Sequence, residues 1–275
     1  DVDSSFTHKS LLKKFIIVAA GPFFNFFLAI FIFYVLYQFS GVYLAKPIIG
    51  EVLEDSPAIA AGIKAQDVIK EINESKIESF EDISRIIGAS KGEQLQIVVE
   101  RDGRLKRLML VPVLRPSKNV FGEEIQKYVI GIVGAGKSFH KRLNPFAAMG
   151  RSFKDTYGLI KLTLLSVGKM ISGSVSADNL GGPLMIAQMA GEQAKAGVMN
   201  FAWFIALLSV NLGIINLFPI PVLDGGHLLF FGIDAVTGKS VSDKLREKLT
   251  QFGAAVLVAL MVFVFYNDIV RMFNG

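Results

Sequence analysis

The chain has 275 residues, of which 52% are hydrophobic, and it carries 23 phenylalanines. This composition is typical of membrane proteins and excludes a fully soluble enzyme. The sequence has no cysteine, so disulfides and thiolate catalysis are excluded, and any metal must be held by His, Asp or Glu. The 29 basic and 24 acidic residues give a net charge of +5, with the basic residues spread along the chain. We therefore expect membrane lipid, and no nucleic acid, as a partner.

Three charge-free apolar stretches predict transmembrane helices, because about 20 apolar residues suffice to cross a bilayer. These stretches are residues 15–45, 196–223 and 249–267. Lys9, Lys13 and Lys14 precede the first stretch, so the positive-inside rule places the N-terminal segment 1–14 in the cytoplasm. Because each span crosses the membrane once, the same rule predicts a cytoplasmic loop at 224–248 and an extracytoplasmic C-terminal tail at 268–275.

Residues 46–115 predict a small β-rich domain. Short apolar runs at 47–52, 67–72, 95–99 and 105–111 are separated by turn residues and predict strands. A helix is predicted between the second and third runs, because apolar residues recur there at steps of three or four from Phe80 to Ile87. With this domain placed between the first two spans, the chain is predicted to fold as an α-helical multi-pass membrane protein with a β-rich insertion.

This β-rich region resembles a bacterial PDZ domain. The resemblance rests on the order of the elements, with Ser56-Pro57-Ala58 and Ala61-Gly62-Ile63 ahead of Asp67-Val68-Ile69. Gln66 and Asn73-Glu74 depart from the glycine-containing turns that the family usually has. PDZ domains bind an extended peptide by strand addition, and the resemblance implies that Gly50 and Val52 lie in the strand beside the peptide.

Residues 116–144 predict a linker with one strand at 128–133. Within 145–195, apolar residues from Phe146 to Ile171 follow helical spacing, with basic residues between them, which predicts an amphipathic helix. We expect this helix to lie on the membrane surface, since cationic residues flank a Phe-rich stripe. The alternative is a helix packed on the soluble domain.

The second apolar stretch ends in an unusual way. Asn216-Leu217-Phe218-Pro219-Ile220-Pro221-Val222-Leu223-Asp224-Gly225-Gly226 places two prolines and a carboxylate where a helix would continue. Pro219 and Pro221 lack a backbone donor, so the helix must unwind. Unpaired backbone at membrane depth is tolerated only inside protein or around a wet cavity. The alternative is an interfacial turn with Asp224 solvated.

Several motifs resemble those of the site-2 proteases, which are intramembrane zinc metalloproteases. Asn216-x-x-Pro219-x-Pro221-x-x-Asp224-Gly225 is similar to the motif of their third membrane helix, and Gly21-Pro22-Phe23-Phe24-Asn25 to that of their second. Leu180-Gly181-Gly182-Pro183 with Ile186-Ala187-Gln188 resembles the segment before the third helix. The PDZ-like insertion fits the bacterial branch that contains the regulator of sigma-E proteases.

The resemblance implies a zinc cofactor with Asp224 as its third ligand. The family's other two ligands and its general base come from a His-Glu-x-x-His motif, which this sequence lacks. We expect that motif in a membrane helix preceding residue 1, so this chain alone is predicted to be inactive. His227 is interpreted as a structural residue. The resemblance gives Asn216, with Pro219 and Pro221, a role in holding unwound substrate, and gives Asn25 a role in shaping the cavity.

The predicted function is that of a bacterial inner-membrane metalloprotease that cleaves a transmembrane segment of a single-pass protein. An anti-sigma factor or a remnant signal peptide would be such a substrate, and the PDZ domain would lie on the extracytoplasmic side. The main alternative is a membrane-anchored PDZ scaffold without hydrolytic activity. A transporter is less favoured, because three spans without inverted repeats make a poor transport pathway.

Overall fold

The computed structural model describes residues 10–176, 181–239 and 241–274. The chain divides into two compact units. The helical unit combines Asp1–Ser40 with Leu143–Gly275, and the β-rich unit is Gly41–Arg142. The β-rich unit is therefore an insertion between the first two long helices of the helical unit.

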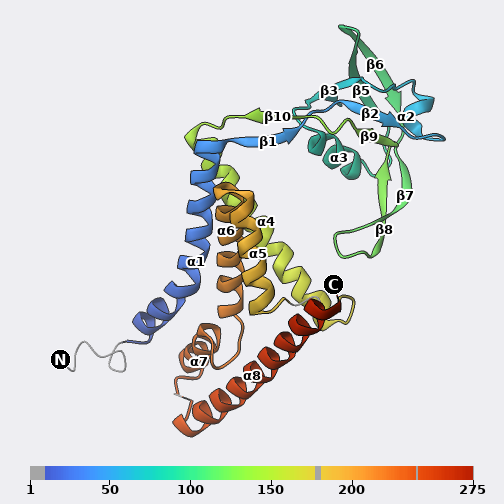
Figure 1. Cartoon of the computed structure of the whole chain (residues 1–275). Coiled ribbons are helices and arrows are strands. Elements are labelled where there is room, and N and C mark those ends of the chain that lie inside the picture. Colours follow the sequence, from blue (N-terminus) through green and yellow to red (C-terminus); the bar gives the residue numbers. More distant parts are fainter. Residues whose placement is uncertain (1–9, 177–180, 240, 275) are drawn as a thin grey trace. The chain divides into compact units, whose positions relative to one another are not determined.

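The helical unit contains six helices (Figure 1) in the part of the chain that the structure describes. They are α1 (Leu11–Ser40), α4 (Pro145–Ile171), α5 (Pro183–Ala196), α6 (Val198–Asn216), α7 (Asp224–Thr237) and α8 (Asp243–Asn274). Three of them contain stretches long and apolar enough to cross a membrane, namely Leu11–Ser40, Val198–Asn216 and Lys244–Phe273. These correspond to the three predicted apolar stretches.

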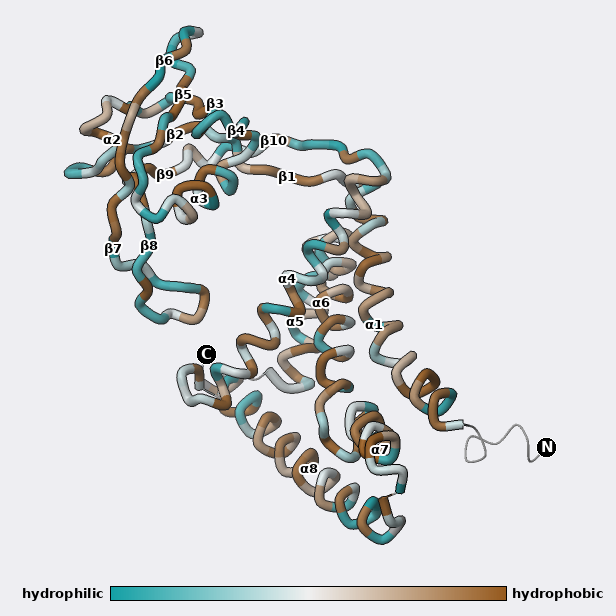
Figure 2. Tube along the Cα trace, turned by 180° about the vertical axis from the view of Figure 1, so that it is seen from behind, coloured by the Kyte–Doolittle hydropathy of each residue, from teal (hydrophilic) through white to brown (hydrophobic). Residues whose placement is uncertain are grey.

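Helices α1 and α6 form the centre of the helical unit. Their contact is built from small and large apolar side chains that are almost fully buried: Ala29, Phe33, Ala206, Val210 and Ile214. Most of the remaining apolar surface stays exposed, and only 17% of the apolar window of α1 and 11% of that of α8 are buried. A helix that is hydrophobic all round and yet exposed is suited to lipid and not to water. Figure 2 shows this apolar colouring along α1, α6 and α8.

Helix α4 packs against the apolar helices through small side chains. Its buried residues are small and four apart, namely Ala148, Ser152 and Thr156, whereas Phe146 is 89% exposed. The hydroxyl of Tyr37 on α1 donates to Asp155 (2.5 Å), and Thr163 donates to Asn211 on α6 (2.9 Å). These bonds tie α4 to two of the apolar helices at different levels. The small-residue face of α4 therefore packs against α1 and α6, because small side chains allow close approach.

The β-rich unit contains ten strands and two helices within Gly41–Arg142. The strands are β1 (Val42–Ala45), β2 (Ile49–Val52), β3 (Val68–Ile72), β4 (Ser75–Lys76), β5 (Leu95–Arg101), β6 (Arg104–Leu110), β7 (Val113–Lys118), β8 (Glu124–Val129), β9 (Ile132–Gly134) and β10 (Ser138–Lys141). The helices are α2 (Pro57–Ala60) and α3 (Phe80–Ala89). The largest sheet has the order β4-β3-β5-β6, and β1-β10, β2-β9 and β7-β8 form antiparallel pairs.

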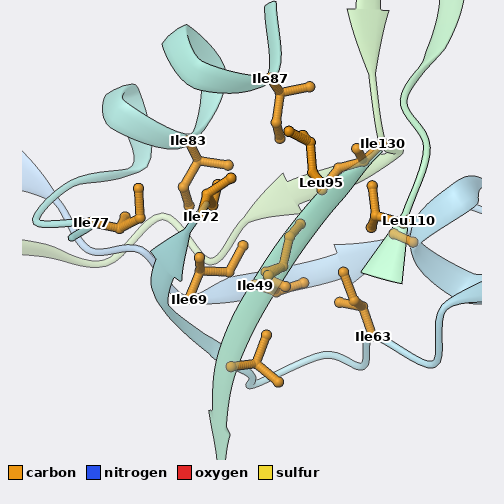
Figure 3. Close-up of a cluster of buried hydrophobic side chains, with 13 residues drawn as sticks. Ile49, Ile63, Ile69, Ile72, Ile77, Ile83, Ile87, Leu95, Leu110 and Ile130 are labelled. Carbon is orange, nitrogen blue, oxygen red and sulfur yellow. The ribbon is translucent and has the colours of Figure 1, made fainter. Parts of the chain in front are cut away.

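The core of this unit consists mainly of isoleucine side chains (Figure 3). Ile69, Ile72 and Ile97 come from the central strands, and Ile83 and Ile87 come from α3. The spacing on α3 matches the predicted helical periodicity, and a capping box at Ser79 with Asp82 starts the helix. Alternating buried positions on β5 place one face of that strand in the core.

A buried ion pair lies at the edge of this core. The carboxylate of Asp67 is fully buried and accepts two hydrogen bonds from Arg101, each 2.7 Å long, and one from the Lys64 backbone N–H (2.9 Å). Burial raises the pKa of Asp67, but the bonds to Arg101 and Lys64 outweigh it and lower the pKa below the ordinary value. Asp67 is thus a carboxylate whose acceptor capacity is satisfied within the protein.

Three predicted segments differ from the structure. Residues 116–144, expected as a linker with one strand, contain the end of β7 together with β8, β9 and β10. The segment 224–248, expected as a loop, begins with helix α7, because the apolar run after Asp224 packs against α1. Residues 268–274, expected as a tail, continue α8, and Asp268 is buried there. The segment 1–9 and Leu180 lie outside the described residues.

Candidate active site

The predicted break in the second apolar helix is present. Helix α6 ends at Asn216, and the N–H groups of Leu217 and Phe218 bond back to Ile214 and Ile215 (both 3.0 Å) in a tightened last turn. Regular helix resumes only at Asp224, after Pro219 and Pro221. The irregular segment between α6 and α7 follows from the two missing proline donors.

A glycine pair lets α7 pack directly on this irregular segment. A Cβ on Gly225 would lie 2.3 Å from the carbonyl oxygens of both Leu217 and Phe218, and one on Gly226 would lie 2.3 Å from that of Ile220. No side chain fits at such distances, so only glycine permits this approach. The pair therefore fixes where the helix begins, and with it the position of Asp224.

Asp224 contacts a motif that is distant in the sequence. Its Oδ2 atom lies 3.1 Å from the point where Gly21 of α1 would carry a Cβ. The contact joins the two segments whose sequences resemble the site-2 protease motifs of the second and third membrane helices. Asp224 is half-buried, and no hydrogen bond or ion pair joins its carboxylate to any residue within the described ranges.

Asn25 lies on the same face of α1 as Gly21, because four residues correspond to about one helical turn. Its backbone carbonyl accepts a hydrogen bond from Ser209 on α6 (2.8 Å), which anchors this turn of α1 to α6. Pro22, next to Gly21 in α1, is fully buried and leaves the α1 ladder without one donor. The structure thus places Asn25 one turn from the Asp224 contact.

Asn216 and the two prolines frame the other side of the break. Asn216 is the last residue of α6 and is half-buried, and its side-chain amide bonds to none of the residues described. Pro219 is exposed, whereas Pro221 is half-buried and its Cδ lies 3.2 Å from a Cβ position on Gly253 of α8. Elements α1, α6, α7 and α8 therefore meet around the irregular segment.

The carboxylate of Asp224 fits the requirements of one metal ligand. It is half-buried, held by rigid backbone and not bound by any other side chain described. A zinc site needs at least three protein ligands, and no group of three His, Asp or Glu residues that could hold a metal occurs in the described part of the chain. His227 is exposed, one turn further along α7. Asp224 can therefore supply one ligand of a set that includes other residues.

Comparison with known proteins identifies the family. The model for peptidase family M50 matches residues 1–260. This chain belongs to peptidase family M50, the site-2 proteases. It is 37% identical over 262 residues to a putative zinc metalloprotease of Agrobacterium fabrum, covering 94% of this chain and 70% of that protein. It is 36% identical over 269 residues to zinc metalloprotease RasP of Geobacillus kaustophilus, covering 98% of this chain and 61% of that protein.

These relatives confirm the predicted family and its zinc cofactor. A third relative, a putative zinc metalloprotease of Rickettsia conorii, is 36% identical over 276 residues, covering 98% of the M50 chain and 76% of that protein. Among solved structures, the PDZ domain of an SdrC-like protein from Listeria monocytogenes matches 32% of this chain and 84% of that chain. The sequence identity of this match is 20% and its TM-score is 0.26.

The β-rich unit has a small hollow, but it does not lie where the sequence placed the peptide groove. A cavity of about 70 Å³ is lined by α3 and by the segment from β8 to β9, including Phe80, Ser84, Tyr128 and Ile132. The predicted residues, Gly50 and Val52, belong to β2, which pairs with β9. A Cβ on Gly50 would lie 2.8 Å from the Cα of Ala135, so this residue faces paired backbone.

The strands beside the hollow are therefore β8 and β9, and not β2. The sequence analysis predicted one strand at 128–133, which covers the end of β8 and the start of β9, but it assigned the peptide groove to the strand at 49–52. One signal was available: the apolar run from Tyr128 to Val133 is interrupted by Gly131, which has a positive φ of 80°. Such a residue ends one strand and starts the next in a new direction.

Proposed function

We propose that this M50 chain is the major part of an intramembrane zinc metalloprotease that cleaves transmembrane segments of single-pass proteins. Anti-sigma factors and remnant signal peptides are the proposed substrates, and the bacterial inner membrane is the proposed location. The three apolar helices would span the bilayer, with the β-rich unit extracytoplasmic. Family membership and the mostly lipid-compatible surface of α1, α6 and α8 support this proposal.

The observation that carries the proposal is the unsatisfied carboxylate of Asp224. An Asp in an apolar helix costs free energy unless it has a partner or a function. The chain positions this one by a glycine pair and a proline break, yet no described residue bonds to it. A metal ion would provide the partner. When bound, zinc supplies an activated water for peptide hydrolysis.

The break itself would engage the substrate. Peptide bonds in a transmembrane helix are shielded by their own hydrogen bonds, so a substrate must unwind locally before hydrolysis. The amide of Asn216 and the carbonyls of the irregular segment offer donors and acceptors to an extended strand. Asn25, one turn from the Asp224 contact, would shape the cavity from the side of α1.

The proposed function is tested in the complete protein with the Asp224→Asn variant. A neutral amide is a poor zinc ligand, so we expect cleavage of a transmembrane reporter to fall by about three orders of magnitude, corresponding to several kcal/mol of lost catalysis. Asp102→Asn, the same change on an exposed hairpin, is the control. Wild-type cleavage by Asp224→Asn would contradict the ligand assignment.

The chain as given lacks a His-Glu-x-x-His motif, and we propose that it neither retains zinc nor hydrolyses peptides by itself. Metal analysis after dialysis tests this. One retained zinc ion per chain would mean that the chain holds a further metal site, with His227 as the first candidate ligand. The alternative function, a membrane-anchored scaffold, is favoured if the complete protein also binds no zinc and cleaves no reporter.

For the β-rich unit we propose a role as a size filter that keeps substrates with bulky extracytoplasmic domains from the site. The hollow beside α3 is small, about 70 Å³, which favours a size filter over a module that binds the substrate's tail. Replacing residues 47–136 by a short linker, which keeps the β1-β10 pair, should permit cleavage of untrimmed substrate. Filling the hollow by Ser84→Trp should leave cleavage of trimmed substrate unchanged, as should the control Glu81→Trp. Loss of cleavage with Ser84→Trp alone would favour tail binding.

A further inference from the structure

A polar hollow lies at the end of the helical unit where α1 and α8 begin. It has a volume of about 290 Å³ and is lined by Leu11, Lys14, Phe231, Asp234, Gly238, Lys239 and Arg246. These residues come from the first turns of α1 and α8 and from the last turns of α7 and the residues after it. Figure 1 shows these segments at the same end of the helical unit.

The charges around this hollow do not balance. Lys14, Lys239 and Arg246 provide three positive charges, whereas Asp234 is the one acidic residue that lines it. The carboxylate of Asp234 is already used, because it accepts bonds from Arg246 (2.6 Å) and from the Val241 N–H (2.9 Å). The two lysines therefore remain without a carboxylate partner in the part of the chain that the structure describes.

Two details indicate a formed site and not a simple charged surface. Lys14 is half-buried while its neighbour Lys13 is exposed, so the chain draws one of the two lysines into the hollow. Arg246 is held by Asp234 and by the ring of Phe230, 5.5 Å from its guanidinium carbon, and its Nε is buried without a partner among the residues described. An anion would supply the missing acceptors.

The surroundings of the hollow indicate the source of that anion. Leu11 and Phe231 line it together with the charges, and the apolar spans of α1 and α8 both start at this point. Figure 2 shows the hydrophilic first turns of α8 giving way to its apolar length. A soluble anion needs no apolar lining, whereas a lipid presents a phosphate and acyl chains together.

We propose that this hollow binds the phosphate of an anionic phospholipid headgroup, held by Lys14, Lys239 and Arg246. The proposal rests on the membrane embedding proposed above, but not on the protease chemistry. It assigns Lys14, one of the lysines before the first apolar stretch, a specific contact in addition to its general effect on topology. Bound lipid would join the starts of α1 and α8 through α7, which carries Asp224 at its other end.

The test uses the full chain in nanodiscs of phosphatidylcholine with or without phosphatidylglycerol. Successful incorporation reports membrane embedding separately from lipid binding. Retained lipid is counted by native mass spectrometry for wild type and for Lys14→Gln/Lys239→Gln. We expect selective retention of phosphatidylglycerol by wild type and a loss of about fivefold in affinity for each lysine removed.

The matched control is Lys244→Gln/Lys248→Gln. It makes the same change in net charge at the same end of α8, but these lysines line a different hollow. Unchanged retention in the control supports a defined site. Equal losses in both pairs, or no loss in either, would overturn it. Displacement of phosphatidylglycerol by inorganic phosphate would instead assign the hollow to a soluble anion.

Discussion

Asp224 and Asp268 are two carboxylates in the apolar part of the chain, and their surroundings differ. Asp268 on α8 is buried, and it accepts hydrogen bonds from the N–H groups of Gly182 (2.9 Å), Leu184 (3.0 Å) and Met185 (3.2 Å). It caps the start of α5, which has no capping side chain of its own. Asp224, at the start of α7, has no such bonds within the described residues.

This difference separates a structural carboxylate from a candidate ligand. The bonds to Asp268 satisfy it completely and tie α5 to α8, so a metal or substrate would gain nothing by binding it. Asp224 is held in place by backbone packing alone and keeps its acceptor capacity free. Residue type does not separate the two carboxylates in advance, but their hydrogen-bond partners do.

The largest effect on stability is expected from removing the structural carboxylate. Asp268→Ala would leave three N–H groups at the start of α5 unpaired, so we expect a loss of about 3 kcal/mol or more and a smaller loss for Asp268→Asn. Thermal unfolding in detergent and hydrogen exchange of residues 182–185 measure it. Asp224→Asn is the comparison and should leave unfolding unchanged, and equal destabilisation by both variants would remove the distinction.

The next effect concerns the backbone that positions Asp224. Gly225→Ala would place a Cβ 2.3 Å from two carbonyl oxygens, so we expect a loss of about 1–3 kcal/mol together with a strong loss of cleavage. Gly232→Ala lies on the same helix, in open space, and should be neutral or slightly stabilising. Thermal unfolding and reporter cleavage are measured on both. Wild-type stability and cleavage in Gly225→Ala would show that packing on the irregular segment does not fix the position of α7.

A third carboxylate, Asp67 in the β-rich unit, tests how a satisfied group responds to pH. Its pKa is lowered in the folded state, so its stabilisation is present above the ordinary Asp pKa and is lost as pH falls below it. We expect hydrogen exchange of β3, corrected for intrinsic rates, to accelerate as the pH falls below about 4. The Asp67→Asn variant should lose this acid dependence, and an unaltered pH profile would contradict the assignment.

The sequence predicted the features that depend on local composition. The apolar stretches, the helix at Phe80 to Ile87 and the proline break at Pro219 follow from hydrophobic spacing and missing donors, and the structure confirms them. Asp224 stood out as a carboxylate in an apolar segment. Whether it acts as a zinc ligand remains a prediction.

The features that the sequence did not predict depend on long-range contacts. The cap on α5 comes from Asp268, more than eighty residues later in the chain. Strand β9 gains its place by pairing with β2 across most of the β-rich unit, so the single strand predicted at 128–133 did not reveal that this run is divided between β8 and β9. Helix α4 packs through small residues that its apolar spacing does not single out, while its Phe-rich stripe stays exposed.

The smallest effect is expected at the contact between Gly21 of α1 and Asp224 of α7. Substitution there should raise stability slightly and lower activity. A Cβ in Gly21→Ala would lie 3.1 Å from Oδ2 of Asp224, so the carboxylate must shift by a few tenths of an ångström. With no bonds to described residues, it can yield at little cost, and alanine in place of glycine stabilises a helix by about 0.5–1 kcal/mol. The unfolding temperature of Gly21→Ala should therefore be slightly higher than that of the wild type. Cleavage should fall severalfold, because a displaced ligand holds the metal less well.

Gly158→Ala on α4, in open space, is the control for the effect of alanine on helix stability. If Gly21→Ala destabilises the protein, or leaves cleavage at the control level, Asp224 is not the freely adjustable carboxylate that a ligand at this contact requires.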